Sequence, residues 1–115
     1  MKNSFEGIGQ WAATFACAKD VAQGQMVKIS SNGTVTACAD DEKFAGQTAA
    51  VGRDGAACSV MLGGMVTAAY TGTAPALGWS GLSANGSGGV KADASGREYL
   101  VVNVEESTMM VTFVL

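Results

Sequence analysis

A hairpin signature between residues 19 and 36 is the feature that most constrains the fold of this chain. The pair Asn32-Gly33 separates two short runs that are rich in β-branched residues. Such a pair favours a two-residue hairpin, because both residues tolerate the positive φ that the turn requires. In the first run Val27 and Ile29 alternate with Met26 on the opposite face, which is the period of a strand buried on one side.

The same pattern of short apolar runs and glycine turns continues to the last residue. No window shows a helical period, and residues 72–96, with seven glycines, are expected to be mostly irregular around one short strand, as either a contact loop or a disordered one. Strands are expected at 11–17, twice within 25–38, and at 44–51, 58–62, 65–71, 89–92, 97–105 and 108–115. The sequence therefore predicts an all-β fold, a small β-barrel or β-sandwich of about seven to nine short strands.

The chain is predicted to have two parts: an extended N-terminal arm (1–10) and a single β domain (11–115). Its 115 residues are 48% apolar and only 15% charged, whereas about 25% charged residues is typical. Because a monomer needs polar groups to cover its surface, this shortage predicts that other subunits cover part of it. The alternative is a monomer whose surface is coated by Ser, Thr and Asn.

Charge and hydropathy exclude several classes of partner. The net charge is −3 and the basic residues are scattered, so no basic stripe is present for nucleic acid. No apolar run approaches the roughly 20 residues of a membrane span. Residues 1–10 lack the apolar core of a secretory signal, and a cytoplasmic origin is expected.

The three cysteines, Cys17, Cys38 and Cys58, have neither a zinc spacing nor a histidine beside them, and they are expected to be buried thiols.

No constellation of residues predicts catalysis, a cofactor or a metal. The sequence has no histidine, the usual general base and metal ligand. The acidic run at 40–42 lacks the ligand spacing of a calcium loop and is expected to be a solvated turn. Lys28 lies within a strand, whereas a biotinyl or lipoyl carrier needs its lysine at a hairpin tip. A non-enzymatic protein is predicted, with a small ligand-binding barrel or carrier-type β domain as the alternative.

Two tryptophans are candidates for contact with a partner. Trp79 lies in Gly78-Trp-Ser-Gly81, where it either anchors an interface or plugs one end of a barrel. Trp11 follows the arm, and a place in the core is the leading interpretation for it, with an interface as the alternative. The last strand is apolar on both faces, so its second face is covered by a neighbouring subunit or by the chain itself. The predicted contact residues are Phe5, Ile8, Trp11, Trp79, Met110 and Val114.

The order of these short patterns resembles that of the small capsid decoration (cement) proteins of tailed bacteriophages, an all-β head-module family. The resemblance covers roughly residues 17–115. Gln47 departs from it, since valine commonly follows the glycine at position 46. The matching positions are Asp20, Val21, Gly24, Val27 and Ile29, the Asn-Gly-Thr-Val turn at 32–35, Phe44-Ala-Gly46, Val60, Gly64 and Val66, Leu77-Gly78 with Leu82, Gly89-Val90, and the terminal apolar strand pair.

This resemblance implies a structural protein that binds the outer surface of an assembled head and stabilises contacts between major capsid subunits. It also implies a homotrimer, which is made in the bacterial host cytoplasm and then found on the exterior of the virion. The major capsid protein is the implied partner, without nucleic acid or membrane. A mildly acidic chain with little charge is compatible with such a role, because it does not compete for the genome.

Overall fold

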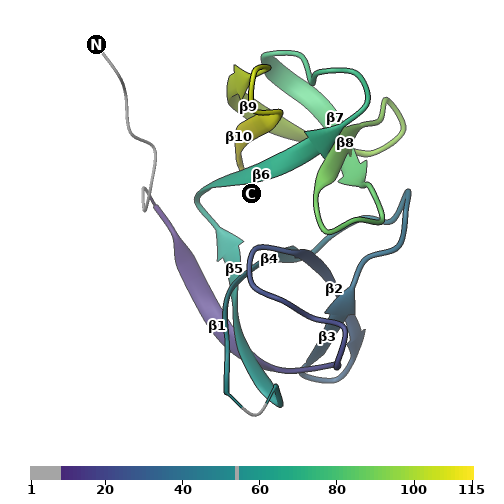
Figure 1. Cartoon of the computed structure of the whole chain (residues 1–115). Coiled ribbons are helices and arrows are strands. Elements are labelled where there is room, and N and C mark those ends of the chain that lie inside the picture. Colours follow the sequence, from purple (N-terminus) through teal and green to yellow (C-terminus); the bar gives the residue numbers. More distant parts are fainter. Residues whose placement is uncertain (1–8, 54) are drawn as a thin grey trace.

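The computed structural model describes residues 9–53 and 55–115, which form ten β-strands and no helix (Figure 1). The predicted all-β class and the barrel are therefore confirmed. None of the described residues belongs to a helix able to cross a membrane. The strands are β1 (Trp11–Cys17), β2 (Met26–Ser31), β3 (Thr34–Ala37), β4 (Gly46–Val51), β5 (Ala57–Gly63), β6 (Met65–Thr71), β7 (Gly78–Ala84), β8 (Val90–Ala92), β9 (Arg97–Glu105) and β10 (Met110–Val114).

These strands close into two barrels. Strands β1–β5 form the first barrel, in the order β1-β3-β2-β4-β5, and β6–β10 form the second, in the order β10-β6-β8-β7-β9. The two barrels lie one above the other in Figure 1, and the described part of the chain measures 39 × 30 × 21 Å. Closure pairs every strand on both sides, which leaves no sheet edge free for unwanted pairing.

Both barrels have the same topology. In each one the first strand is parallel to the third, as β1 is to β3 and β6 is to β8. All other pairs are antiparallel and join equivalent strands: β1·β5 and β6·β10, β2·β3 and β7·β8, β2·β4 and β7·β9, β4·β5 and β9·β10. The chain is thus a tandem repeat of one five-stranded barrel, in which β1 to β5 correspond to β6 to β10.

The expected irregularity of residues 72–96 is wrong for β7. This strand runs from Gly78 to Ala84 and pairs with both β8 and β9. Its small residues have low strand propensity, which conceals it in the sequence. The structure explains one of them, because a Cβ on Gly81 would lie 2.2 Å from the carbonyl oxygen of Asp93. A glycine is therefore needed where the 93–96 turn crosses the strand.

The two barrels have different cores. The first is filled by small side chains, with Val27, Val35 and Val60 fully buried. The second contains Tyr70 and, beside it, a cluster of three aromatic rings in mutual contact, of which Tyr99 and Phe113 come from its own strands. The third ring is Phe44, which precedes β4 of the first barrel and stacks on Tyr99 with ring centroids 5.1 Å apart. A side chain from one barrel therefore completes the interior of the other.

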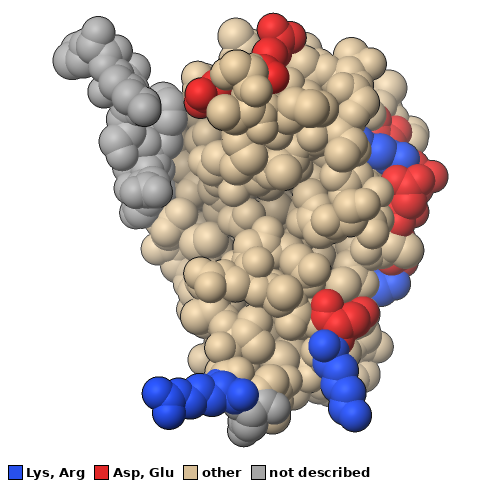
Figure 2. Space-filling model, viewed as in Figure 1, with Lys and Arg blue, Asp and Glu red and all other residues tan. Residues whose placement is uncertain are grey.

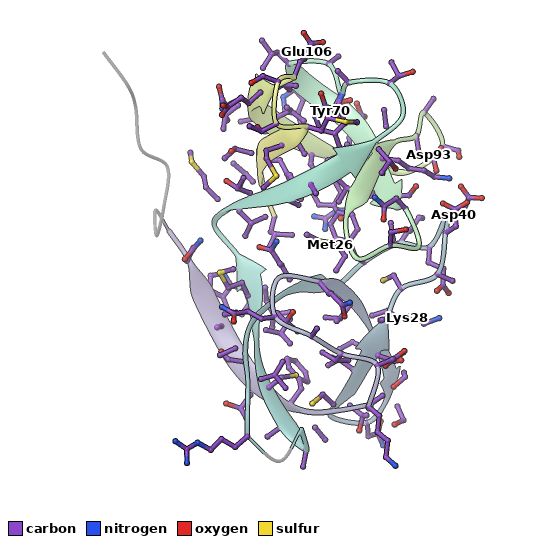
Figure 3. The ribbon with its side chains drawn as sticks, in the orientation of Figure 1. Met26, Lys28, Asp40, Tyr70, Asp93 and Glu106 are labelled. Atoms are coloured by element: carbon purple, nitrogen blue, oxygen red, sulfur yellow. The ribbon has the colours of Figure 1, made fainter. Side chains whose placement is uncertain are left out.

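Met26 shows how closely the barrels are joined. It was expected on the less buried face of its strand, yet it is fully buried in the core of the second barrel (Figure 3). Its backbone N–H donates to the carbonyl of Gly88, at 3.0 Å. The side-chain amide of Gln47 donates to the carbonyl of Thr67, at 3.0 Å, and so links β4 to β6. The face expected to be less buried is covered because the second barrel packs on it.

The acidic run at 40–42 fastens the first barrel to the second. It was expected to be a solvated turn, but the Lys91 ammonium of β8 lies between the carboxylates of Asp40, at 3.0 Å, and Asp41. Glu42 accepts from Lys28 at 2.5 Å, and this hydrogen bond raises the pKa of the lysine and lowers that of the carboxyl. Side-chain ammonium groups, rather than solvent alone, therefore neutralise this loop.

Candidate contact surface

A row of four outward-facing apolar side chains crosses the second barrel. We call Trp79, Leu100, Val114 and Met65 the apolar row. Trp79 of β7 pairs with Leu100 of β9, Leu100 with Val114 of β10, and Val114 with Met65 of β6. Directly opposed residues on neighbouring strands project from the same face of the sheet, so the four side chains form one continuous line.

The alternation of each strand explains why this row faces outward. Tyr99 and Val101 flank Leu100 and are buried in the core, as Phe113 is beside Val114. Because successive side chains point to opposite faces, Leu100 and Val114 must point away from the interior. Both are half-buried, whereas Trp79 is 70% exposed.

Shallow depressions flank Trp79 on two sides. One has a volume of about 590 Å³ and is lined mostly by small residues of β7 and of 92–96, with Asp93 and Glu98 at its edge. The other, of about 170 Å³, is lined by Trp79 together with Leu100, Val114 and neighbouring residues. A large ring that protrudes between two hollows has the form of an interface anchor. Trp79 therefore does not fill the end of its own barrel, which was the alternative to an interface role.

Trp11 is also exposed, which corrects the interpretation that placed it in the core. It begins β1 opposite Gly63, and 59% of it is exposed. A Cβ on Gly63 would lie 1.8 Å from the indole nitrogen of Trp11, so the indole lies directly over this glycine. Gly63 ends β5 next to Gly64 at the junction of the barrels, and Met65 of the apolar row follows. The second tryptophan thus lies close to one end of the row.

The remaining predicted contact residues have different outcomes. Phe5 and Ile8 lie outside the described residues. Met110 and Val114 alternate with the buried Val111 and Phe113, so both point away from the core, and both are half-buried. Only Val114 belongs to the apolar row. The structure therefore brings Trp79 and Val114 together through Leu100.

Among the apolar surface residues that escaped the sequence analysis are Leu100, Met65 and Ile29. Leu100 could have been found, because β9 was predicted and Leu100 lies on the opposite face from Tyr99 and Val101. Met65 begins a predicted strand, and only the barrel pairing shows that it adjoins Val114. Ile29 was expected to be buried with Val27, but it is 50% exposed at the end of β2.

Charge is scarce on much of the molecular surface. On the face shown in Figure 2, charged side chains gather at the two ends and along one edge, and the middle is uncharged.

Within the described residues there is no group of three or more Cys, Asp or Glu placed to hold a metal ion. Burial raises the pKa of the Cys38 and Cys58 thiols to about 11, so both are protonated and unreactive at neutral pH.

The fold and the surface together define a small two-barrel β protein with exposed aromatic anchors. No protein-family model matches the sequence, and no curated protein matches it.

Proposed function

We propose that this protein is a phage head decoration protein, which binds the outer surface of the capsid and stabilises contacts between major capsid subunits. The observation that carries the proposal is the apolar row, which leaves Trp79 exposed on a rigid strand. Tryptophan is enriched among interface residues whose truncation costs about 2 kcal/mol or more. The resemblance of the ordered sequence patterns to the cement proteins supports the same role.

The rigid fold suits a purely structural task. The two closed barrels are joined through the core of the second, since Phe44 and Met26 extend from the first barrel into it. A surface on such a body is pre-organised, and little conformational entropy is lost when it binds. A homotrimer adds avidity, because weak contacts from three copies act together on the symmetric shell. No catalytic step belongs to this function, and the virion exterior is the proposed location.

The alternative, a small ligand-binding barrel or carrier domain, receives less support. The interior of the second barrel is filled by the packed rings of Phe44, Tyr99 and Phe113. Lys28 lies in mid-strand and is paired with Glu42, whereas the tip of the hairpin is formed by Asn32-Gly33.

The test is co-sedimentation of the purified protein with expanded, undecorated heads. We expect the wild-type protein to pellet with the heads and Trp79→Ala to bind at least about 30-fold more weakly, as loss of an anchor residue implies. Met109→Ala is the matched control, since Met109 is also exposed, at 42%, but lies in the β9–β10 turn outside the apolar row. Wild-type protein that stays wholly in the supernatant would reject the proposal.

A further inference from the structure

The larger of the two hollows beside Trp79 has two carboxylates at its edge. We call this hollow the acidic bay. Its lining consists of alanine and glycine residues except for Trp79, Ser80, Asp93 and Glu98. No lysine or arginine among the described residues lines it. The bay therefore combines an exposed indole ring with two negative charges.

Strand register explains why the ring and one carboxylate lie on the same side of the sheet. Trp79 of β7 pairs with Leu100 of β9, and the next outward pair is Gly81 with Glu98. Trp79 and Glu98 are therefore diagonal neighbours, roughly 7–8 Å apart. Because Gly81 places no side chain between them, the gap can admit one group that touches both the ring and the carboxylate.

The second carboxylate is held in place by its own turn. Asp93 directly follows β8 (Figure 3), and its N–H donates to the carbonyl of Gly81 at 2.9 Å. The N–H and the hydroxyl of Ser95 both donate to Oδ1 of Asp93, at 3.0 and 2.7 Å. These hydrogen bonds lower the pKa of Asp93, so the carboxyl group is ionised at neutral pH. Its charge is thus fixed at the edge of the bay before any partner binds.

Neither carboxylate of the bay forms an ion pair among the described residues. The two basic residues nearest to them in sequence are engaged elsewhere. The Lys91 ammonium lies between the carboxylates of Asp40 and Asp41. The Arg97 guanidinium lies over the ring of Tyr99, 4.9 Å from its centroid. A partner of opposite charge would therefore find the bay unpaired.

We propose that the acidic bay receives a basic side chain, a lysine or an arginine, that the capsid surface presents beside the apolar row. The cation lies against the Trp79 ring, within reach of the carboxylates of Asp93 and Glu98. Among aromatic side chains, tryptophan attracts a cation most strongly. The inference rests on the proposed function for the source of this side chain, and it adds the charge that the partner must carry.

The groups that line the bay favour a cation over other ligands. Its two charged groups have the same sign, so they attract a cation and repel an anion. A wholly apolar group would leave both carboxylates desolvated and unpaired, which is costly. A sugar has hydroxyls that need donors as well as acceptors, and the only donors among the lining side chains are the Ser80 hydroxyl and the Trp79 indole N–H.

Small probes test the bay in the absence of heads. N-acetyl-arginine methylamide and N-acetyl-lysine methylamide are the cationic probes, and their citrulline and norleucine analogues are neutral controls of similar shape. We expect only the cationic probes to shift the indole N–H resonance of Trp79 saturably, in roughly the millimolar range. Trp79→Phe assigns this resonance, since Trp11 is the other tryptophan. A shift with methyl glucoside but not with the cationic probes would make the bay a sugar site instead.

Co-sedimentation with undecorated heads tests the same residues in the proposed role. Asp93→Asn combined with Glu98→Gln keeps the shape of both side chains and removes both charges. We expect this double variant to bind heads on the order of 10-fold more weakly, and its binding to depend less on NaCl concentration than that of the wild type. Glu105→Gln is the matched control, because Glu105 is an exposed carboxylate of the same strand as Glu98 but does not line the bay. Circular dichroism verifies that the variants fold.

The outcomes separate this inference from the proposed function. The inference is overturned, and head binding stands, if the double variant binds heads as tightly as the wild type. Cationic probes that leave the Trp79 resonance unmoved, or that move it no more than the neutral probes do, would overturn it as well. So would a Glu105→Gln variant as defective as the double variant, because net charge would then be the cause. Heads that bind no wild-type protein would reject the proposed function, and the probes would still decide the inference.

Discussion

The junction of the two barrels should be intolerant of any side chain at Gly64. This residue connects β5 to β6 with φ +91°, a conformation that L side chains rarely adopt. A Cβ there would lie 2.5 Å from the backbone nitrogen of Gln10 and 2.6 Å from its Cα. The carbonyl of Gly64 also accepts the N–H of Leu115, at 2.9 Å. The segment before β1 and the last described residue thus meet on one glycine.

Two separate costs follow for Gly64→Ala. Holding alanine in this region of φ costs about 1–3 kcal/mol. The close approach to the backbone of Gln10 adds about 1–3 kcal/mol, since overpacking forces the neighbouring chain to shift. We therefore expect a loss of about 2–6 kcal/mol, a large part of the 5–15 kcal/mol that ordinarily stabilises a domain.

Gly72→Ala is the matched control for this substitution. Gly72 has φ +76°, but a Cβ there would meet nothing within 4 Å. It carries only the conformational cost of about 1–3 kcal/mol. Equilibrium unfolding in urea, followed by fluorescence and circular dichroism, gives the midpoint and slope for each variant. If Gly64→Ala proves no less stable than Gly72→Ala, the close packing of the junction on Gln10 is refuted.

Two further predictions concern the contacts between the barrels, and a third concerns an ion pair within the first barrel. Phe44→Ala should lower the free energy of unfolding by about 3–5 kcal/mol, measured in urea, because it removes the ring stacked on Tyr99. Gln47→Val should cost about 0.5–1.5 kcal/mol, because the part-buried hydrogen bond from its amide to the carbonyl of Thr67 is lost; an unchanged urea midpoint would contradict this. The pKa of Glu42 is lower in the folded protein than in the unfolded chain. Its ion pair therefore stabilises the fold at pH values above the pKa of an ordinary carboxyl group, and this stabilisation is lost as the pH falls through the pKa of the folded state. Thermal unfolding of Glu42→Gln should therefore depend less on pH below about 4.5 than that of the wild type.

Local patterns predicted most of the strands but not their partners. The bounds of β1, β6 and β9 match the expected ranges 11–17, 65–71 and 97–105, because each is a run rich in apolar residues between turn signals. β7 could not be predicted in this way, since Gly78 and Gly81 meet the needs of the turn and of a crossing chain rather than of strand propensity. The internal repeat was concealed as well, because equivalent strands share pairing and not residues.

Exposure depends on which face meets the other barrel, and no local pattern contains that information. Met26 and Trp79 hold equivalent positions, yet the first is fully buried and the second is 70% exposed. Alternation alone placed Met26 on the less buried face and Ile29 in the core, whereas the second barrel buries Met26 and Ile29 is 50% exposed near the end of β2. The contact surface could therefore be predicted only in its residue types, two tryptophans and an apolar terminal strand.

The two barrels differ in the connection between their third and fourth strands, and this difference bears on the role of Trp79. The connection from β3 to β4 carries Phe44 into the second core. The equivalent connection in the second barrel, Asp93-Ala-Ser-Gly96, is short and has no large side chain. Asp93 is held in its own turn, where Ser95 donates to its carboxylate and lowers its pKa. Of the positions equivalent to Met26 and Phe44, only that of Met26 has a large apolar side chain in the second barrel, which is Trp79. No side chain of the 93–96 connection can therefore compensate for its loss from the apolar row.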